Sequence, residues 1–215
     1  MRRTRTRSLT FIRLGMLAGA AGALLAAQSA SAVVDEGAAQ GPKALIAVLH
    51  PVAQETGNVD ESITLGTVRF TPGKDKVDVL VQVNGVSVAG SEATQAADGQ
   101  GAYYKHGIHI HEGGACGPTE KDGQKVPAGA AGGHFDPAKT ASHKGPEGAG
   151  HAGDLPNLQV LADGSGILMT STNRLTMDQL VGKTVILHAN PDNYTDQPAN
   201  GGSGARIACG VIKAE

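Results

Sequence analysis

Short runs of β-branched and apolar residues, separated by turn signals, most strongly constrain what this chain can fold into. The turn signals include Asn84-Gly85 and Asp163-Gly164, and this alternation is typical of antiparallel sandwiches and barrels. No long stretch has the 3.6-residue apolar period of an amphipathic helix, and residues 176–180 favour only one helical turn. The runs occupy residues 43–50, 62–70, 77–83, 157–163, 166–172, 184–189 and 206–212. The sequence therefore predicts an all-β fold.

The first 32 residues have the three-part layout of a secretory signal peptide. Five arginines and no acidic residue precede an apolar run of 14 residues, and the segment ends in Ala30-Ser31-Ala32, an A-x-A cleavage site. The apolar run is short for a bilayer-spanning helix, although an uncleaved N-terminal anchor is the alternative. We expect a signal peptide at 1–32, a flexible tail at 33–42 and one folded domain at 43–215, with no stable membrane span after cleavage.

The charge balance argues against a nucleic-acid surface. Five of the 18 basic residues lie in the leader, so the exported chain would keep 13 basic residues against 20 acidic ones. Its lysines and arginines are scattered, whereas nucleic-acid binding requires them to cluster. Only two cysteines are present, Cys116 and Cys209, and an exported protein of this size favours joining them in one disulfide. The sequence thus predicts a protein of the periplasm, the cell surface or the medium.

Two long segments interrupt the rhythm of short strands. Residues 112–156 and 190–205 are rich in glycine and small or polar residues and contain hardly any apolar run. Loops of this length inside a compact domain are usually functional or disordered. The first segment contains three of the eight histidines of the chain, which favours a functional loop.

The histidines are spaced as metal ligands. In a strand, residues two apart face the same side, so His109 and His111 can point at one spot. His134, His143 and His151 follow in the first long segment, and Asp154 comes three residues later. Imidazole suits zinc and copper, and a carboxylate is an ordinary zinc ligand. Neither the H-E-x-x-H nor the G-x-S-x-G motif is present, so the pattern predicts a metal site without naming the metal.

Several segments resemble the copper/zinc superoxide dismutase family. They are HGIHIHE (106–112), GGHFDP (132–137), HKGPEGAGHAGDLP (143–156), DNYTDQP (192–198) and GGSGARIACGV (201–211). The segment at 192–198 resembles the exported bacterial branch of the family, and the likeness extends over residues 43–213. The resemblance implies an eight-stranded flattened Greek-key β-barrel or sandwich with two long functional loops.

The resemblance also implies two metal sites, with one copper and one zinc per subunit. The implied copper ligands are His109, His111, His134 and His188, and the implied zinc ligands are His134, His143, His151 and Asp154. His134 would then serve both metals through its two ring nitrogens as a bridging imidazolate. Asp192 matches an aspartate that orients ligands of both sites, Arg206 matches the active-site arginine, and Cys116 and Cys209 match the disulfide.

The activity implied by the resemblance is dismutation of superoxide to dioxygen and hydrogen peroxide. Copper would cycle between Cu(II) and Cu(I), His134 would exchange copper for a proton, and Arg206 would attract the anion. The role would be protection against extracytoplasmic superoxide. A metal-buffering module of the same fold and an adhesion sandwich are the alternatives, but filled ligand positions disfavour both. A homodimer stays open, because bacterial members vary, and His106 is expected to be structural.

Overall fold

The computed structural model describes residues 44–97, 99 and 101–215. The expected signal peptide and tail lie outside the described residues. Within the described part, no helix combines the length and the apolar character needed to cross a lipid bilayer. Nearly all of the regular structure is β, which confirms the predicted fold class.

Antiparallel strands form one large sheet and one small hairpin. The large sheet contains β1 (Leu45–Pro51), β2 (Gly66–Gly73), β3 (Lys76–Val83), β4 (Ala93–Gln95), β5 (Ala102–His106), β6 (Ile108–His111), β9 (Leu158–Leu161), β10 (Gly166–Thr172), β11 (Thr184–His188), β12 (Arg206–Val211) and β13 (Lys213–Ala214). The hairpin pairs β7 (Thr119–Lys121) with β8 (Gln124–Val126). The other elements are α1 (Met177–Leu180), η1 (Gly129–Ala131) and η2 (Ala199–Gly202).

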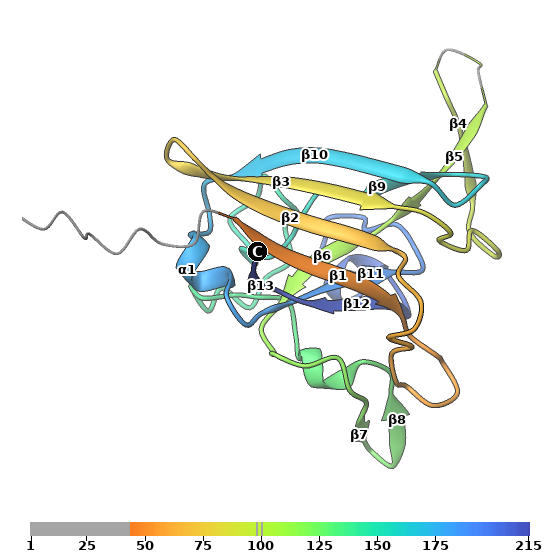
Figure 1. Cartoon of the computed structure of the whole chain (residues 1–215), viewed down its shortest axis with the longest axis horizontal. Coiled ribbons are helices and arrows are strands. Elements are labelled where there is room, and N and C mark those ends of the chain that lie inside the picture. Colours follow the sequence, from red (N-terminus) through yellow and green to blue (C-terminus); the bar gives the residue numbers. More distant parts are fainter. Residues whose placement is uncertain (1–43, 98, 100) are drawn as a thin grey trace, which may run out of the picture. The chain divides into compact units, whose positions relative to one another are not determined.

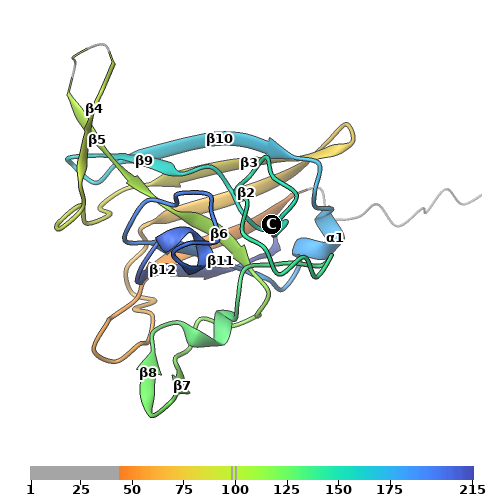
Figure 2. The same ribbon diagram turned by 180° about the vertical axis from the view of Figure 1, so that it is seen from behind.

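The large sheet curls because one chain segment connects its two ends. The strand order is β4-β5-β9-β10-β3-β2-β1-β12-β11-β6, so β5 and β6 lie near opposite ends although only Gly107 separates them in sequence. A β-carbon at Gly107 would clash with the side chain of Ser203, so only glycine fits this crossing. Counting β5 and β6 as one strand leaves eight main strands, and the short β4 and β13 extend them. Figures 1 and 2 show the curled sheet, with the β4–β5 and β7–β8 hairpins projecting from it.

The inner face of the sheet holds the hydrophobic core. Alternate residues of β3 are buried, as expected for a strand with one solvated face, and β2 adds the fully buried Val68 and Phe70. β2 begins at Gly66, four residues later than expected. The Asp60 carboxylate accepts hydrogen bonds from the backbone N–H and the hydroxyl of Ser62, and such local side-chain bonds compete with strand pairing.

The first long segment is more ordered than its composition suggests. It contains the β7–β8 hairpin, whose two-residue turn is Asp122-Gly123. Both turn residues have positive φ, 53° and 74°, as a type I′ turn requires. An Asp-Gly pair favours this turn, but the flanking residues are mostly polar, so the hairpin was not among the expected strands.

Candidate metal centre

The structure brings the seven predicted ligand residues together around β6. His109 and His111 lie on this strand and are fully buried. Isolated backbone bridges join His109 to Asp154 and His111 to His134, which places the long loop directly on β6. Three sets of possible ligand atoms lie within 4.8 Å of one another in the described residues. The first group is His109, His111, His134 and His188, and the second group is His134, His143, His151 and Asp154. A third set, His109, His143 and Asp192, connects these two groups. His134 belongs to both of these groups.

Two histidines of the first group have their protonation fixed by backbone carbonyls. His111 Nδ1 lies 3.0 Å from Gly132 O, and His188 Nδ1 lies 3.1 Å from Gly204 O. A carbonyl only accepts hydrogen bonds, so Nδ1 of each ring donates and Nε2 carries the lone pair. The two Nε2 atoms are 3.4 Å apart. Burial lowers the pKa of both rings well below the ordinary value, so two lone pairs face each other and a cation between them is the natural partner.

Asp192 orients one histidine of each group. Its Oδ2 lies 2.8 Å from His109 Nε2, and its Oδ1 lies 2.8 Å from His143 Nε2. Each ring therefore donates Nε2–H to a carboxylate and leaves Nδ1 free. Burial favours a neutral carboxyl, but the bonds from His109 and His143 hold the pKa of Asp192 well below its usual range. The Asn157 side chain fixes Asp192 in turn, because its Oδ1 accepts from the Asp192 N–H.

The second group consists of a carboxylate surrounded by three rings. Asp154 Oδ1 lies 2.9 Å from His134 Nδ1, and Asp154 Oδ2 lies 3.0 Å from His143 Nδ1. Although burial opposes the charge, the neighbouring His134 and His143 rings keep the pKa of Asp154 well below its usual range. Burial lowers the pKa of His134 to about 4. For His143 the two aspartates outweigh burial and raise the pKa to about 9.

Buried polar atoms without hydrogen-bond partners mark where metal ions fit. Eight buried side-chain atoms of the described residues have no hydrogen-bond partner, and four of them are His109 Nδ1, His143 Nδ1, His151 Nδ1 and Asp154 Oδ2. Leaving such atoms unsatisfied is costly, and a metal ion in each group would supply the missing partner of these four. Three histidines with a carboxylate suit zinc, and an all-imidazole set suits copper. The donor sets therefore fit a copper ion and a zinc ion side by side.

Arg206 stands at the mouth of the first group. A pocket of about 470 Å³ is lined by His111, His134, His188, Arg206 and residues of the 198–204 loop. The guanidinium donates to Ala128 O and Gly132 O, each at 2.7 Å, which fixes it beside the histidines. Lys144 pairs with Asp196, and neither Lys121 nor Lys125 lines this pocket. The anion-attracting charge among its lining residues is therefore Arg206.

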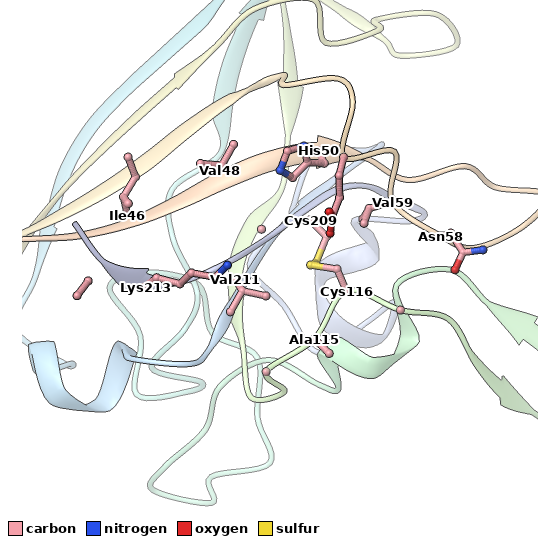
Figure 3. A pocket seen from close by; sticks show the side chains of 15 residues that line it. Ile46, Val48, His50, Asn58, Val59, Ala115, Cys116, Cys209, Val211 and Lys213 are labelled. Atoms are coloured by element: carbon pink, nitrogen blue, oxygen red, sulfur yellow. A yellow bond between two sulfur atoms is a disulfide. The ribbon is translucent and has the colours of Figure 1, made fainter.

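The predicted disulfide is present. Cys116 and Cys209 are bonded, and Cys209 lies three residues after Arg206 on β12. The bond ties the loop after β6 to the strand that carries the arginine. Figure 3 shows it inside a separate groove of about 700 Å³ on the side of β1 and β12, lined by residues such as Val48 and Val211. This larger groove contains none of the grouped histidines.

The family resemblance named the residues of the two groups, but the sequence did not indicate most of the residues that hold them in place. Asn157 and Tyr194 hold Asp192 and its loop, and Arg174 contacts the loop between His143 and His151. Tyr194 lies within the motif at 192–198, so the motif could have indicated its supporting role. Nothing in the sequence indicated a role for Arg174. His106 belongs to neither group, as expected, and its Nδ1 donates to His188 O at 2.8 Å.

Comparison with known proteins identifies the family. Residues 64–212 match the sequence profile described as copper/zinc superoxide dismutase. The chain belongs to the copper/zinc superoxide dismutase family. Copper and zinc are the cofactors of this family, in agreement with the two donor sets.

Relatives in several bacteria support the assignment to the copper/zinc superoxide dismutases. A copper/zinc superoxide dismutase of Salmonella typhimurium is 50% identical over 111 residues, which cover 51% of this chain and 64% of the relative. The chain therefore aligns with just under two thirds of that protein. A Deinococcus radiodurans copper/zinc superoxide dismutase is 39% identical over 156 residues, which cover 69% of this chain and 77% of the relative. The solved copper/zinc superoxide dismutase of Brucella abortus has a TM-score of 0.67 and 34% sequence identity. That match covers 79% of this chain and 99% of the solved chain.

Proposed function

We propose that this chain is an exported superoxide dismutase, which converts two superoxide anions and two protons into dioxygen and hydrogen peroxide. The observation that carries the proposal is the position of His134, which belongs to both buried ligand groups and lines the pocket beside Arg206. A metal-storage site would need neither a shared ring nor a fixed arginine at its entrance. The leader sequence, the disulfide and the bacterial relatives support export.

Different residues of the chain would bind copper and zinc. His109, His111, His134 and His188 would hold copper, and His134, His143, His151 and Asp154 would hold zinc. Bound copper supplies one-electron chemistry by alternating between Cu(II) and Cu(I), whereas zinc has no redox chemistry and acts structurally. Asp192 accepts from Nε2 of His109 and of His143, so Nδ1 is the nitrogen of each ring that would bind a metal.

Arg206 and His134 act on the substrate. The guanidinium is permanently charged and is held by two carbonyls, so it can bind a small anion in the pocket without moving. His134 Nδ1 faces Asp154, which leaves Nε2 for the first group. When Nε2 is free it can hold one of the two protons that leave with hydrogen peroxide.

The test combines metal analysis with superoxide decay. We expect the purified chain, supplied with both ions, to bind one copper and one zinc and to remove superoxide rapidly in pulse radiolysis. His134→Gln should weaken binding of both metals. His50→Gln should behave as wild type, because the His50 ring belongs to neither ligand group and bonds the Ile63 carbonyl. Bound metals without turnover would replace the proposal with a metal-buffering function.

A further inference from the structure

Two of the proposed zinc ligands lie at the two ends of one closed loop. His143 and His151 stand near the ends of residues 142–151, and the His151 N–H donates to Ser142 O at 3.0 Å, which closes the loop on itself. A β-carbon at Gly150 would clash with Ser142 O, so the two ends of the loop are packed directly against each other. Compact loops of this kind are stabilised by side chains that pack inside them.

The side chain of Arg174 occupies that centre. The acceptors of its guanidinium are Gly145 O and Pro146 O, both at 3.1 Å from Nη1, and Gly150 O and His151 O, at 2.6 and 2.7 Å from Nη2. All four carbonyls belong to the segment between the two histidines or to His151 itself. Hydrogen bonds from a charged donor are stronger than neutral ones, and the planar fork of arginine can serve several acceptors at once.

Arg174 is itself anchored to the framework of the fold. It lies between β10 and α1, and its backbone N–H donates to Thr172 Oγ1 at 3.1 Å. The next residue, Leu175, is buried in the core. Thr176 then begins α1 with a capping box to Gln179. The guanidinium therefore projects from a rigid connection, and the loop is held by it.

Contacts on the loop's other side come from the segment after Asp192. Asp196 accepts hydrogen bonds from the His143 N–H and the Ser142 hydroxyl, and Tyr194 packs so closely on Gly145 that a β-carbon there would lie 2.7 Å from its ring. These contacts fix the first half of the loop. Among the described residues, Arg174 is the side chain that hydrogen-bonds the backbone of both halves.

We infer that Arg174 is a positioning residue for the zinc site, which holds His143 and His151 in the binding arrangement before the metal arrives. The inference rests on the proposed function only in assuming that the second group binds zinc. Without the guanidinium, four carbonyls lose their donor and the loop must order itself when zinc binds. Residues that orient ligands from behind typically change metal affinity by about 10- to 100-fold.

The copper group is expected to be insensitive to the same change. Three of its members, His109, His111 and His188, belong to β6 and β11, which pair along their length. Their ring orientations depend on Gly132, Gly204 and Asp192 rather than on Arg174. Loss of Arg174 should therefore separate zinc affinity from copper affinity.

The experiment titrates the metal-free full chain with zinc, with copper and with cobalt as a spectroscopic substitute for zinc. The variants are Arg174→Lys, Arg174→Met and the control Arg69→Met, which removes an exposed arginine paired with Glu215. We expect Arg174→Met to weaken zinc binding about 10- to 100-fold and to weaken the tetrahedral cobalt bands. The zinc affinity of Arg174→Lys should lie between those of wild type and Arg174→Met, because an ammonium group cannot donate to four separate carbonyls. Copper affinity and Arg69→Met should match wild type.

The outcomes separate this inference from the proposed function. If wild type binds zinc but Arg174→Met binds it equally well, or loses zinc and copper affinity alike, the positioning role is wrong. If wild type itself binds no zinc, the proposed function fails and the inference with it. Should Arg174→Met not fold, hydrogen exchange of metal-free wild type decides: slow exchange of the His151 amide supports a preformed loop, and fast exchange overturns it.

Discussion

Replacing Asp192 with asparagine should weaken one metal site and spare the other. Asp192 Oδ1 accepts from both the His143 ring and the Tyr194 N–H, whereas Oδ2 accepts only from the His109 ring. In Asp192→Asn the amide oxygen must take the Oδ1 position, since an NH₂ group there would face the Tyr194 N–H. The NH₂ group then donates to His109 Nε2. The ring proton of His109 must therefore move to Nδ1, the nitrogen that would bind copper.

The expected magnitude follows from that single lost acceptor. The copper group loses one correctly protonated ligand, and comparable changes behind a metal ligand cost about 10- to 100-fold in affinity, or about 1.4 to 2.8 kcal/mol. The zinc group keeps the bond from His143 to the amide oxygen and loses only the charge of this acceptor, so its affinity should fall by less than the affinity for copper.

Competition titrations with copper and zinc chelators measure both affinities on the same preparation. Asp163→Asn is the control, because it changes an exposed turn carboxylate that bonds only its own turn. A larger loss for zinc than for copper would refute the assignment of Oδ1 and Oδ2. Unchanged affinity for both metals would show that Asp192 does not set the ring protonation at all.

Two further changes test the pocket and the disulfide. Wild-type activity should fall as ionic strength rises, and a flat salt profile would contradict electrostatic attraction. Arg206→Glu should slow superoxide removal about tenfold or more, while elemental analysis should find the wild-type metal content. Reduction of the Cys116–Cys209 bond should lower both metal content and activity. It should also lower the free energy of unfolding by up to about 4–5 kcal/mol, because the bond closes a loop of 93 residues. Equal metal content and activity in the reduced and oxidised forms would contradict a role for the bond at the site.

Much of the site could be predicted from local sequence pattern. The i, i+2 spacing of His109 and His111 fixes their common direction once they lie in a strand, and β6 confirms that they do. Two cysteines in a chain expected to be exported left one pairing, which the structure contains. Both inferences depend on local geometry or on counting, and neither needs the register of distant strands.

Other parts depend on long-range contacts that leave no local pattern. Arg174 bonds backbone carbonyls, and any residue type supplies a carbonyl, so the sequence of the loop does not reveal its partner. The direction of Lys144 is set by Asp196, which lies 52 residues away. The late start of β2 reflects competition between a local turn at Asp60 and strand pairing, and apolar composition alone does not resolve that competition.

The central claim is that one histidine ring serves two metals. The most direct measurement is a crystal structure of the chain loaded with copper and zinc, with anomalous data collected at both absorption edges. The account predicts a copper peak and a zinc peak on the two nitrogens of His134. Peaks on separate residues, or a His134 ring bound to only one metal in every oxidation state, would contradict it.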